Sequence, residues 1–341
     1  MREPAFWYRP PSSISRLLTP LGAIYGAITA QRMVRTGIRA DIPVFCIGNY
    51  HVGGAGKTPT TLALAKLLRE LGEQPFVVSR GYGGALSGPV RVDPAGHTAA
   101  DVGDEPLMMA AQVPVIVSRE RVEGAALARA QGATVALLDD GFQNPALIKD
   151  ASLIVIDAAR GIGNGCVFPA GPLRAPLPPQ IARTDALIVI GAGESADGIA
   201  TSARTSGASV LRARLVPDQA SLDQLRGQRV LAFAGIGDPA RFFATLRSSG
   251  VDVIEERIFA DHHPFTPDEI GRLASAAAAK SLTLVTTEKD MARIRSDVRL
   301  QKYADKISAF AVTLAFDDEA KLKEFVAARL TKARARPIRP S

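Results

Sequence analysis

Short apolar runs alternate in the first part of the chain with longer segments whose apolar residues recur at helical spacing. The runs predict strands at 43–48, 75–79, 114–117, 134–138, 153–157 and 186–190. The segments between them predict helices at 57–71, 104–112 and 121–131. Because strands that alternate with helices form parallel sheets covered on both faces, we expect an α/β fold built on such a sheet.

A second, shorter set of alternating elements follows. Its pattern predicts strands near 229–233, 252–257 and 282–286, and helices near 239–249 and 267–279. Two further apolar runs, 209–216 and 307–314, flank this set, and we expect them to pair as a two-stranded linker between domains. The predicted division is a larger domain at 1–218, a smaller α/β domain at 219–330 and a disordered basic tail at 331–341.

The first forty residues combine aromatic, basic and apolar side chains. Six arginines stand there against one acid, Glu3, and an aromatic triplet occupies 6–8. Thr19-Pro20 predicts either a kink or the start of a second helix. Large apolar residues fall on one helical face, namely Ile14, Leu17, Leu18, Leu21, Ile24, Tyr25 and Ile28. The uncharged stretch is too short to span a bilayer, so two interpretations stay open: an amphipathic helix at a membrane surface, or a helix packed on its own domain.

Composition restricts the classes of function. The chain has 341 residues, of which 47% are apolar and 22% charged, as is typical of a folded protein with a sizeable core. Its formal net charge of +7 favours an anionic partner, such as nucleic acid, anionic lipid or a phosphorylated substrate. The sequence has neither zinc-ligand spacing nor an RNA-binding aromatic signature, so we expect no nucleic-acid partner. Two cysteines, Cys46 and Cys166, cannot form a disulfide framework.

A glycine-rich loop follows the first predicted strand and precedes the first predicted long helix, which is the order that a P-loop requires. The residues expected to contact ATP are Gly53, Gly54, Ala55, Gly56, Lys57 and Thr58. Lys57 would reach the β- and γ-phosphates, and Thr58 would offer its hydroxyl to Mg²⁺. The common patterns require Gly at position 51 or Lys at position 52, where this chain has His51 and Val52. The alternative is a chance glycine-rich turn, which the flanking elements argue against.

Two carboxylates, Asp139 and Asp140, follow the apolar run at 135–138. An apolar strand that ends in carboxylates is typical of a Walker B strand, which directs them at the metal ion of the nucleotide. The alternative is a solvated turn, because Gly141 comes next. The P-loop upstream favours the metal-binding interpretation.

Other segments carry candidate chemistry. Asp104 lies at a predicted helix start, where it is either an N-cap or a carboxylate that accepts a hydroxyl proton near the γ-phosphate. His262 and His263 are adjacent in an apparent loop, which raises the odds of a functional role. Arg174 belongs to a Pro/Gly-rich segment and is either a surface residue or a phosphate ligand. The segment 286–290 ends a predicted strand, so it should lie at the ligand edge of the second sheet.

Together these segments resemble one family closely, the tetraacyldisaccharide 4′-kinases, which are the lipid A 4′-kinases of Gram-negative bacteria. The matching segments span nearly the whole chain and lie at 6–8, 48–59, 79–84, 103–106, 139–143, 163–174, 259–265 and 286–290. Their joint presence in this order is more specific than a P-loop alone. One departure is Asn144, where the family usually has His after Asp-Asp-Gly-Phe-Gln, and the resemblance carries no role over to it.

The resemblance implies transfer of the ATP γ-phosphate to the 4′-hydroxyl of an acylated glucosamine disaccharide 1-phosphate. It also implies Mg²⁺ and a peripheral position on the anionic, cytoplasmic face of the bacterial inner membrane. By the family pattern, Asp104 matches the catalytic base and His262, rather than His263, its partner. The ATP and Mg²⁺ residues would include Lys57, Thr58, Asp139 and Asp140, and further active-site positions that bind substrate would be Glu105 and Arg174.

Two rival functions fit parts of the pattern. A membrane-associated P-loop switch ATPase would usually carry Lys at position 52, which is Val52 here. A soluble sugar kinase would not need the arginine-rich, amphipathic start of the chain. ATP hydrolysis without a phosphorylated lipid would favour the switch ATPase, and full activity on a de-acylated acceptor would favour the sugar kinase.

Overall fold

The larger domain is built on a mixed sheet whose central strands are parallel. The computed structural model describes residues 3–54 and 56–336. Within them, nine strands form this sheet in the order β13-β8-β7-β6-β1-β5-β2-β4-β3. In chain order these strands are β1 (Val44–Gly48), β2 (Pro75–Ser79), β3 (Val90–Arg91), β4 (Val115–Val117), β5 (Val135–Asp139), β6 (Ala151–Asp157), β7 (Ala186–Ile190), β8 (Ser209–Pro217) and β13 (Val312–Phe316). Only β3 and β13 run antiparallel to their neighbours among the described strands, so the predicted parallel sheet is confirmed.

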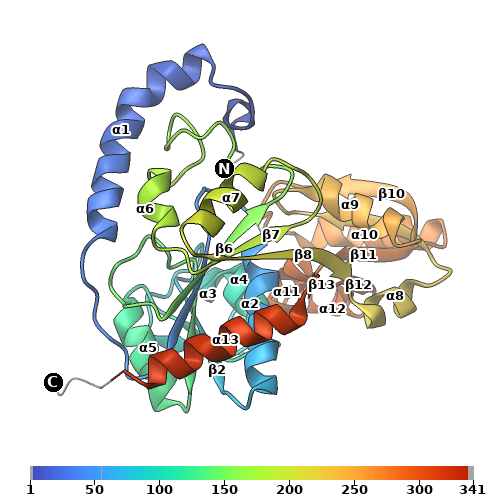
Figure 1. Cartoon of the computed structure of the whole chain (residues 1–341). Helices are drawn as coiled ribbons and strands as arrows, with labels where there is room; N and C mark the ends of the chain where they lie inside the picture. The colour runs from blue at the N-terminus through green and yellow to red at the C-terminus, as the bar shows by residue number, and fades with distance from the viewer. Residues whose placement is uncertain (1–2, 55, 337–341) are drawn as a thin grey trace.

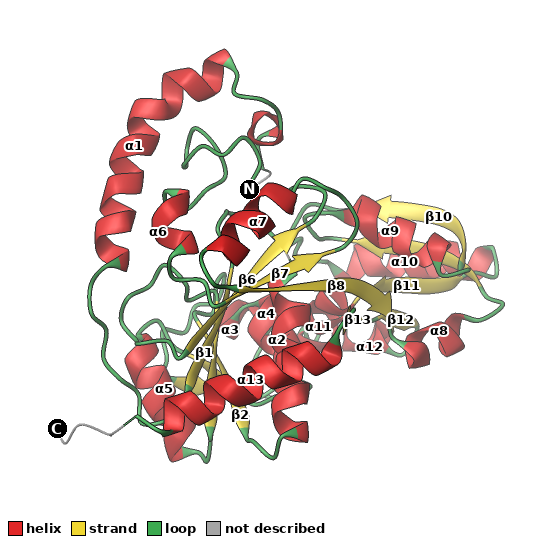
Figure 2. Cartoon of the chain, viewed as in Figure 1, coloured by secondary structure: helices red, strands yellow, loops and turns green. Residues whose placement is uncertain are grey.

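Helices cover both faces of this sheet (Figure 2). One face packs against α2 (Lys57–Glu70), α4 (Asp104–Ala110) and α13 (Glu319–Arg334), and the other against α5 (Arg121–Ala130) and α7 (Asp197–Thr205). Strands β1, β2, β5, β6 and β7 are buried along their whole length. Because both faces of these strands are covered, their sequences read as continuous apolar runs rather than as alternating ones. Short helices α3 (Ala99–Val102) and α6 (Leu177–Ile181) lie in the connections.

The smaller domain is a second α/β unit, on the right in Figure 1. Its sheet has the order β10-β9-β11-β12 among the described residues, and all its pairs are parallel. The strands are β9 (Arg229–Ala234), β10 (Asp252–Ile258), β11 (Thr283–Thr287) and β12 (Ile307–Phe310). The helices are α8 (Gln219–Leu225), α9 (Pro239–Ser248), α10 (Pro267–Ala279), α11 (Glu288–Ser296) and α12 (Gln301–Ala304).

The connection between the domains differs in part from the prediction. The apolar run at 307–314 divides into β12, which joins the smaller sheet, and β13, which pairs antiparallel with β8 as expected. The pair β8–β13 is also the edge of the large sheet, because β8 pairs with β7. The predicted linker is therefore continuous with the larger domain.

The end of the chain corrects the predicted domain boundary and the predicted tail. Helix α13 carries Leu322, Val326 and Leu330 at four-residue spacing, and these residues pack into the core of the larger domain. The larger domain therefore takes in residues after 311, although they follow the smaller domain in the sequence. Residues 331–334 are helical rather than tail-like, and 337–341 lie outside the described residues.

Helix α1 (Ser13–Met33) lies along one side of the larger domain (Figure 1). It is preceded by the short 3₁₀ helix η1 (Ala5–Tyr8) and runs through Pro20 as one helix, so no second helix starts there. Its inner face is small: Gly22 and Gly26 are buried, and a Cβ on Gly22 would lie 2.8 Å from the Val167 carbonyl oxygen. Its large apolar residues point to solvent, with Leu17 79% and Ile24 61% exposed. No described helix has the length and apolar content needed to cross a bilayer.

Candidate active site

The glycine-rich loop joins β1 to α2, in the strand–loop–helix order of a P-loop. Gly56 precedes Lys57 in the left-handed region (φ 89°), and a Cβ there would lie 2.7 Å from Ile190 Cδ1. The Asn49 amide donates to the Gly53 carbonyl oxygen (3.0 Å), which also lies 3.5 Å from Lys57 Nζ. Thr58 is buried in the first turn of α2, and Ala55 lies outside the described residues. The backbone N–H groups at the start of α2 therefore form a site suited to phosphate.

The departure at position 51 is accommodated by packing. His51 is 1% exposed and its backbone pairs with Leu173, in the segment that carries Arg174. Burial lowers the pKa of His51 below 6.5, so the ring is neutral near pH 7. The Val52 N–H also donates to the Pro172 carbonyl oxygen (2.8 Å). These contacts fix the Pro/Gly-rich segment against the P-loop.

Arg174 is thereby placed beside the Walker B carboxylates. Its two Nη atoms donate to Asp140 Oδ1 (2.6 Å) and Oδ2 (2.9 Å), and its Nε donates to the His51 carbonyl oxygen (3.1 Å). Burial raises the pKa of Asp140, but the charges of Lys57 and Arg174 outweigh it and hold that pKa below 3.8. Asp140 is therefore ionised, and one residue predicted to bind substrate is paired with one predicted to bind metal.

Asp139 differs from its neighbour because one of its oxygens is free. It is 4% exposed, and Oδ2 accepts a hydrogen bond from the Ser79 hydroxyl (3.0 Å). Oδ1 is buried and has no hydrogen-bond partner among the described residues. Burial, together with the charges of Glu105 and Asp140, raises the pKa of Asp139 to about 6. A buried, unpartnered carboxylate oxygen is costly unless a cation neutralises it.

Across the site, the smaller domain brings His262 to Asp104. His262 Nδ1 lies 2.6 Å from Asp104 Oδ2, at the start of α4, and His262 has a positive φ of 58°. Arg293 on α11 contacts the same oxygen through Nε (2.8 Å) and Nη2 (2.7 Å). Burial raises the pKa of Asp104, but the bonds from His262 and Arg293 prevail and lower it from 3.8 to about 2. The hydrogen bond to Asp104 raises the pKa of His262 above 6.5.

The adjacent histidine has a different environment. His263 Nε2 lies 3.1 Å from both carboxylate oxygens of Glu269, and its ring packs against Phe259 and Phe265. This arrangement supports the loop and the start of α10. The structure therefore brings His262, and not His263, to Asp104, as expected from the resemblance.

The sequence interpretation missed residues that complete the site. Lys289, inside the segment 286–290, pairs with Glu105, and Arg293, which lies beyond that segment, pairs with Asp104. Their spacing of four on a helix that follows a strand end is the signal that could have found them. Near the P-loop, the Glu3 carboxylate accepts a hydrogen bond from the Tyr8 hydroxyl (2.6 Å) and lies against Gly53.

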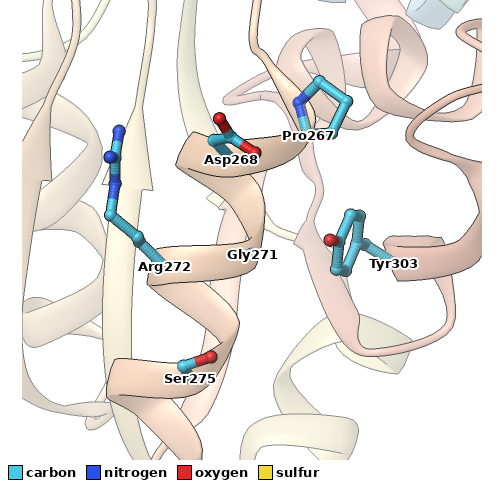
Figure 3. A pocket seen from close by; sticks show the side chains of 6 residues that line it. All are labelled: Pro267, Asp268, Gly271, Arg272, Ser275 and Tyr303. Atoms are coloured by element: carbon cyan, nitrogen blue, oxygen red, sulfur yellow. The ribbon is translucent and has the colours of Figure 1, made fainter.

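Two cavities lie outside this cluster. One, of about 490 Å³, separates the carboxyl ends of β6 and β7 from α9, and its rim holds the ion pairs Arg241–Asp157 (2.7 Å) and Arg160–Asp238 (3.0 Å). The other, of about 470 Å³, lies on α10. There the side chains of Arg272, Ser275 and Tyr303 point in different directions (Figure 3), so no polar groups converge and we assign no site to it.

Comparison with known proteins agrees with this geometry. The family model for tetraacyldisaccharide-1-P 4′-kinase (LpxK) matches residues 14–331. A tetraacyldisaccharide 4′-kinase from Rhodopseudomonas palustris (strain ATCC BAA-98 / CGA009) is 67% identical over 335 residues, covering 98% of both chains. One from Nitrobacter hamburgensis is 65% identical over 334 residues, covering 98% of this chain and 100% of the relative.

A crystal structure of LpxK from Aquifex aeolicus in complex with ATP is also similar. The TM-score is 0.71 at 26% identity, and the match covers 93% of this chain and 99% of that chain. The predicted fold, enzyme class and ATP dependence are thus confirmed, and the two rival functions are not favoured. The chain belongs to the tetraacyldisaccharide-1-P 4′-kinase family, the ATP-dependent lipid kinases of lipid A biosynthesis.

Proposed function

We propose that the chain transfers the γ-phosphate of ATP to the 4′-hydroxyl of tetraacyldisaccharide 1-phosphate at the edge where the two domains meet. One observation carries the proposal: the P-loop and Asp139 lie at the carboxyl ends of the neighbouring strands β1 and β5, and the Asp104–His262 pair lies beside them, because Glu105, next to Asp104, is close enough to Asp139 and Lys57 for their charges to interact. Loop residues Gly53 to Thr58 would surround the phosphates, and Lys57 would neutralise the charge that develops during transfer. Phosphoryl transfer depends mainly on such positioning and charge neutralisation.

The acceptor hydroxyl would be positioned by Asp104. Its Oδ2 already binds His262 and Arg293, and no described residue donates to Oδ1. A sugar hydroxyl at Oδ1 would direct its oxygen at the γ-phosphate and give its proton to the carboxylate as the new P–O bond forms. His262, which bonds the opposite oxygen, would stabilise the charged carboxylate before transfer.

Residues that fit Mg²⁺ are present at the P-loop. Among the described residues, no three His, Cys, Asp or Glu side chains gather to hold a metal by themselves. Mg²⁺ in kinases usually keeps waters and binds one or two carboxylates together with phosphates, so a complete protein cage is not required. The free Oδ1 of Asp139, with Thr58 and Asp140, suits this mode. The ion would offset charge on the phosphate oxygens.

We assign supporting roles to the two remaining predicted residues. Arg174 would hold Asp140 in place through its paired hydrogen bonds and present positive charge to the phosphates. Glu105 would link the site to the smaller domain through Lys289.

The nucleoside of ATP would occupy the cavity beside Ile190 and Gly191, on the side of the P-loop away from β5.

The enzyme would act at the cytoplasmic face of the inner membrane as a peripheral protein. The support is the apolar face of α1, where Ile14, Leu17, Leu21, Ile24 and Ile28 are each more than half exposed. Such a face beside arginines suits the interface of an anionic bilayer, where an acylated substrate would reside.

The test is a transfer assay with [γ-³²P]ATP and tetraacyldisaccharide 1-phosphate in mixed micelles. We expect label in the lipid with the wild-type chain and none with Lys57→Ala, whose fold should be intact because the ammonium group of Lys57 makes only one long hydrogen bond among the described residues, to the Gly53 carbonyl oxygen (3.5 Å). ATP hydrolysis without labelled lipid would instead identify a switch ATPase. Equal turnover of a de-acylated acceptor would identify a soluble sugar kinase.

A further inference from the structure

Helix α11 of the smaller domain presents two cations to two adjacent acids of the larger domain. Lys289 and Arg293 lie four residues apart and therefore on one face of the helix. Lys289 pairs with Glu105, and Arg293 pairs with Asp104, at the first turn of α4. The acid proposed to receive the hydroxyl proton is thus held by a residue outside its own domain.

Arg293 is itself held firmly. Its side chain is 8% exposed, and Nη1 donates to Asp290 Oδ1 (2.7 Å) and to the Gly235 carbonyl oxygen (3.0 Å). Asp290 is fully buried, and its Oδ2 accepts bonds from the Gly235 N–H (3.0 Å) and the Thr287 hydroxyl (2.8 Å). These bonds lie within the smaller domain, so the guanidinium has a fixed orientation before it meets Asp104.

The contacts at Asp104 are one-sided. Arg293 Nε, Arg293 Nη2 and His262 Nδ1 all lie within 2.8 Å of the single oxygen Oδ2. No described donor bonds Oδ1. A carboxylate with two hydrogen bonds and a further ion-pair contact on one oxygen cannot rotate freely, and its other oxygen keeps one direction.

We propose that Arg293 is a positioning residue that fixes the carboxylate of Asp104, with Oδ2 toward the smaller domain and Oδ1 toward the acceptor hydroxyl. Because His262 and Arg293 both come from the smaller domain, the alignment requires the two domains to be in contact. This inference rests on the proposed function, in which Asp104 accepts the hydroxyl proton.

The charges around Asp104 and His262 allow a test by the pKa of His262, which a role of Arg293 in packing alone would not change. Asp104 faces His262 and Arg293, while His262 also faces Asp261, whose Oδ1 lies 3.8 Å from Nε2, and Lys289. Without Arg293, the carboxylate would be compensated by His262 alone. It would then hold the imidazole proton more tightly, and the pKa of His262 would rise.

The kinetic test compares Arg293→Gln and Arg293→Lys with the control Arg295→Gln, an exposed arginine on the same helix. For Arg293→Gln we expect kcat to fall about 10- to 100-fold, as for a misplaced catalytic group, with the KM for ATP nearly unchanged. Arg293→Lys should recover part of kcat because it keeps the charge. An unchanged kcat in folded Arg293→Gln, or a loss equal to that of Arg295→Gln, would overturn the proposal.

A second measurement does not depend on turnover. NMR titration of the imidazole signals, with His262 assigned by its loss in His262→Gln, should give a pKa for His262 that is higher by about 0.5 or more in Arg293→Gln. If Arg293→Gln does not fold, the measurement is made on Arg293→Lys. This variant conserves the charge, so the pKa of His262 should rise less. No rise in a folded Arg293 variant would refute the positioning role. If the pKa of His262 rises in Arg293→Gln but the wild-type chain transfers no phosphate to the lipid, the proposed function is refuted and the positioning of Asp104 by Arg293 still stands.

Discussion

At the residue scale, neighbouring residues of the same type have different environments. Asp139 is buried with one oxygen that has no hydrogen-bond partner among the described residues, whereas both oxygens of Asp140 accept hydrogen bonds from Arg174. His262 contacts the acid of the other domain, whereas His263 packs between aromatic rings. We therefore expect substitutions of two neighbouring residues to change different measured properties, such as Mg²⁺ dependence, kcat or melting temperature.

For the carboxylates, we expect Asp139→Asn to lower turnover about 10²- to 10³-fold, as for loss of a preorganised charged group. The variant should need more Mg²⁺ for half-maximal rate, because the buried free oxygen loses its charge. Asp140→Asn should also be impaired, but it should weaken the hold on Arg174 as well. The measurement is initial rate against Mg²⁺ concentration, with the exposed Asp41→Asn as control. Wild-type Mg²⁺ dependence in both active-site variants would mean that these residues form only a turn.

For Asp104, the proposed proton acceptor, we expect Asp104→Asn to lower kcat about 10²- to 10⁴-fold with little effect on ATP binding. His262→Ala should lose less, and the double variant should lose less than the two losses combined, because the residues act as a unit. His263→Gln is the matched control and should lower the melting temperature more than kcat. Strictly additive losses in the double variant would argue against a coupled pair.

At the scale of elements, α1 is oriented by its small residues. Gly22 and Gly26 allow the close approach to the 167–176 segment, and the large apolar face is left outside. An apolar helical face of this kind is typical of a protein that binds a membrane surface. Because the large apolar side chains of α1 point away from the core, a substitution on this outer face should alter lipid binding without changing the stability of the fold.

We therefore expect the double variant Leu17→Glu/Ile24→Glu to bind phosphatidylglycerol vesicles at least about tenfold more weakly, since each large apolar side chain contributes roughly 1.5–3 kcal/mol when buried. Its thermal stability should be unchanged. The control is Val298→Glu, because Val298 is as exposed as Leu17 (both 79%) but lies in the smaller domain. Sedimentation at low and high salt measures the binding, and high salt should weaken it in the wild-type chain by screening the arginines. Equal sedimentation of both variants would place the membrane contact elsewhere.

At the scale of the whole molecule, ion pairs join the domains on two sides of the P-loop. Asp104 and Glu105 pair with α11 on one side, and Arg241–Asp157 and Arg160–Asp238 bridge the cavity on the other. These contacts bring the two halves of the site together, so the stability of the closed arrangement should depend on pH.

The sign follows from the direction of each pKa. The pKa of His262 is raised above 6.5, so its contribution to stability is complete below about pH 6.5 and is lost as the pH rises through the higher folded value. The pKa of Asp104 is lowered from 3.8 to about 2, so its contribution is present above pH 3.8 and is lost as the pH falls toward 2. The gap in unfolding free energy between wild type and His262→Gln should be widest between these limits. Urea unfolding across pH 4–9 measures it, and a gap that widens above pH 7 would contradict the assignment.

Local pattern alone determined much of this protein. The strand–helix alternation, the P-loop and the Walker B strand were all predicted from spacing, because strand and helix periodicity and the freedom of glycine at Gly56 are properties of short segments. The candidate residues Lys57, Asp104, Asp139 and Arg174 were found in the same way. The resemblance to a kinase family then indicated that these residues serve one reaction, the transfer of phosphate from ATP.

Only the tertiary structure decided which of these residues meet. Three features depend on contacts between segments far apart in the sequence. The apolar face of α1 points to solvent, β13 and α13 pack on the larger domain, and Arg293 contacts Asp104. His262 and Arg293 lie 158 and 189 positions from Asp104, and no local pattern records which side chain of a distant loop or helix will face it. Such pairings are set by how two independently formed sheets dock, and that depends on shape and charge across the whole interface.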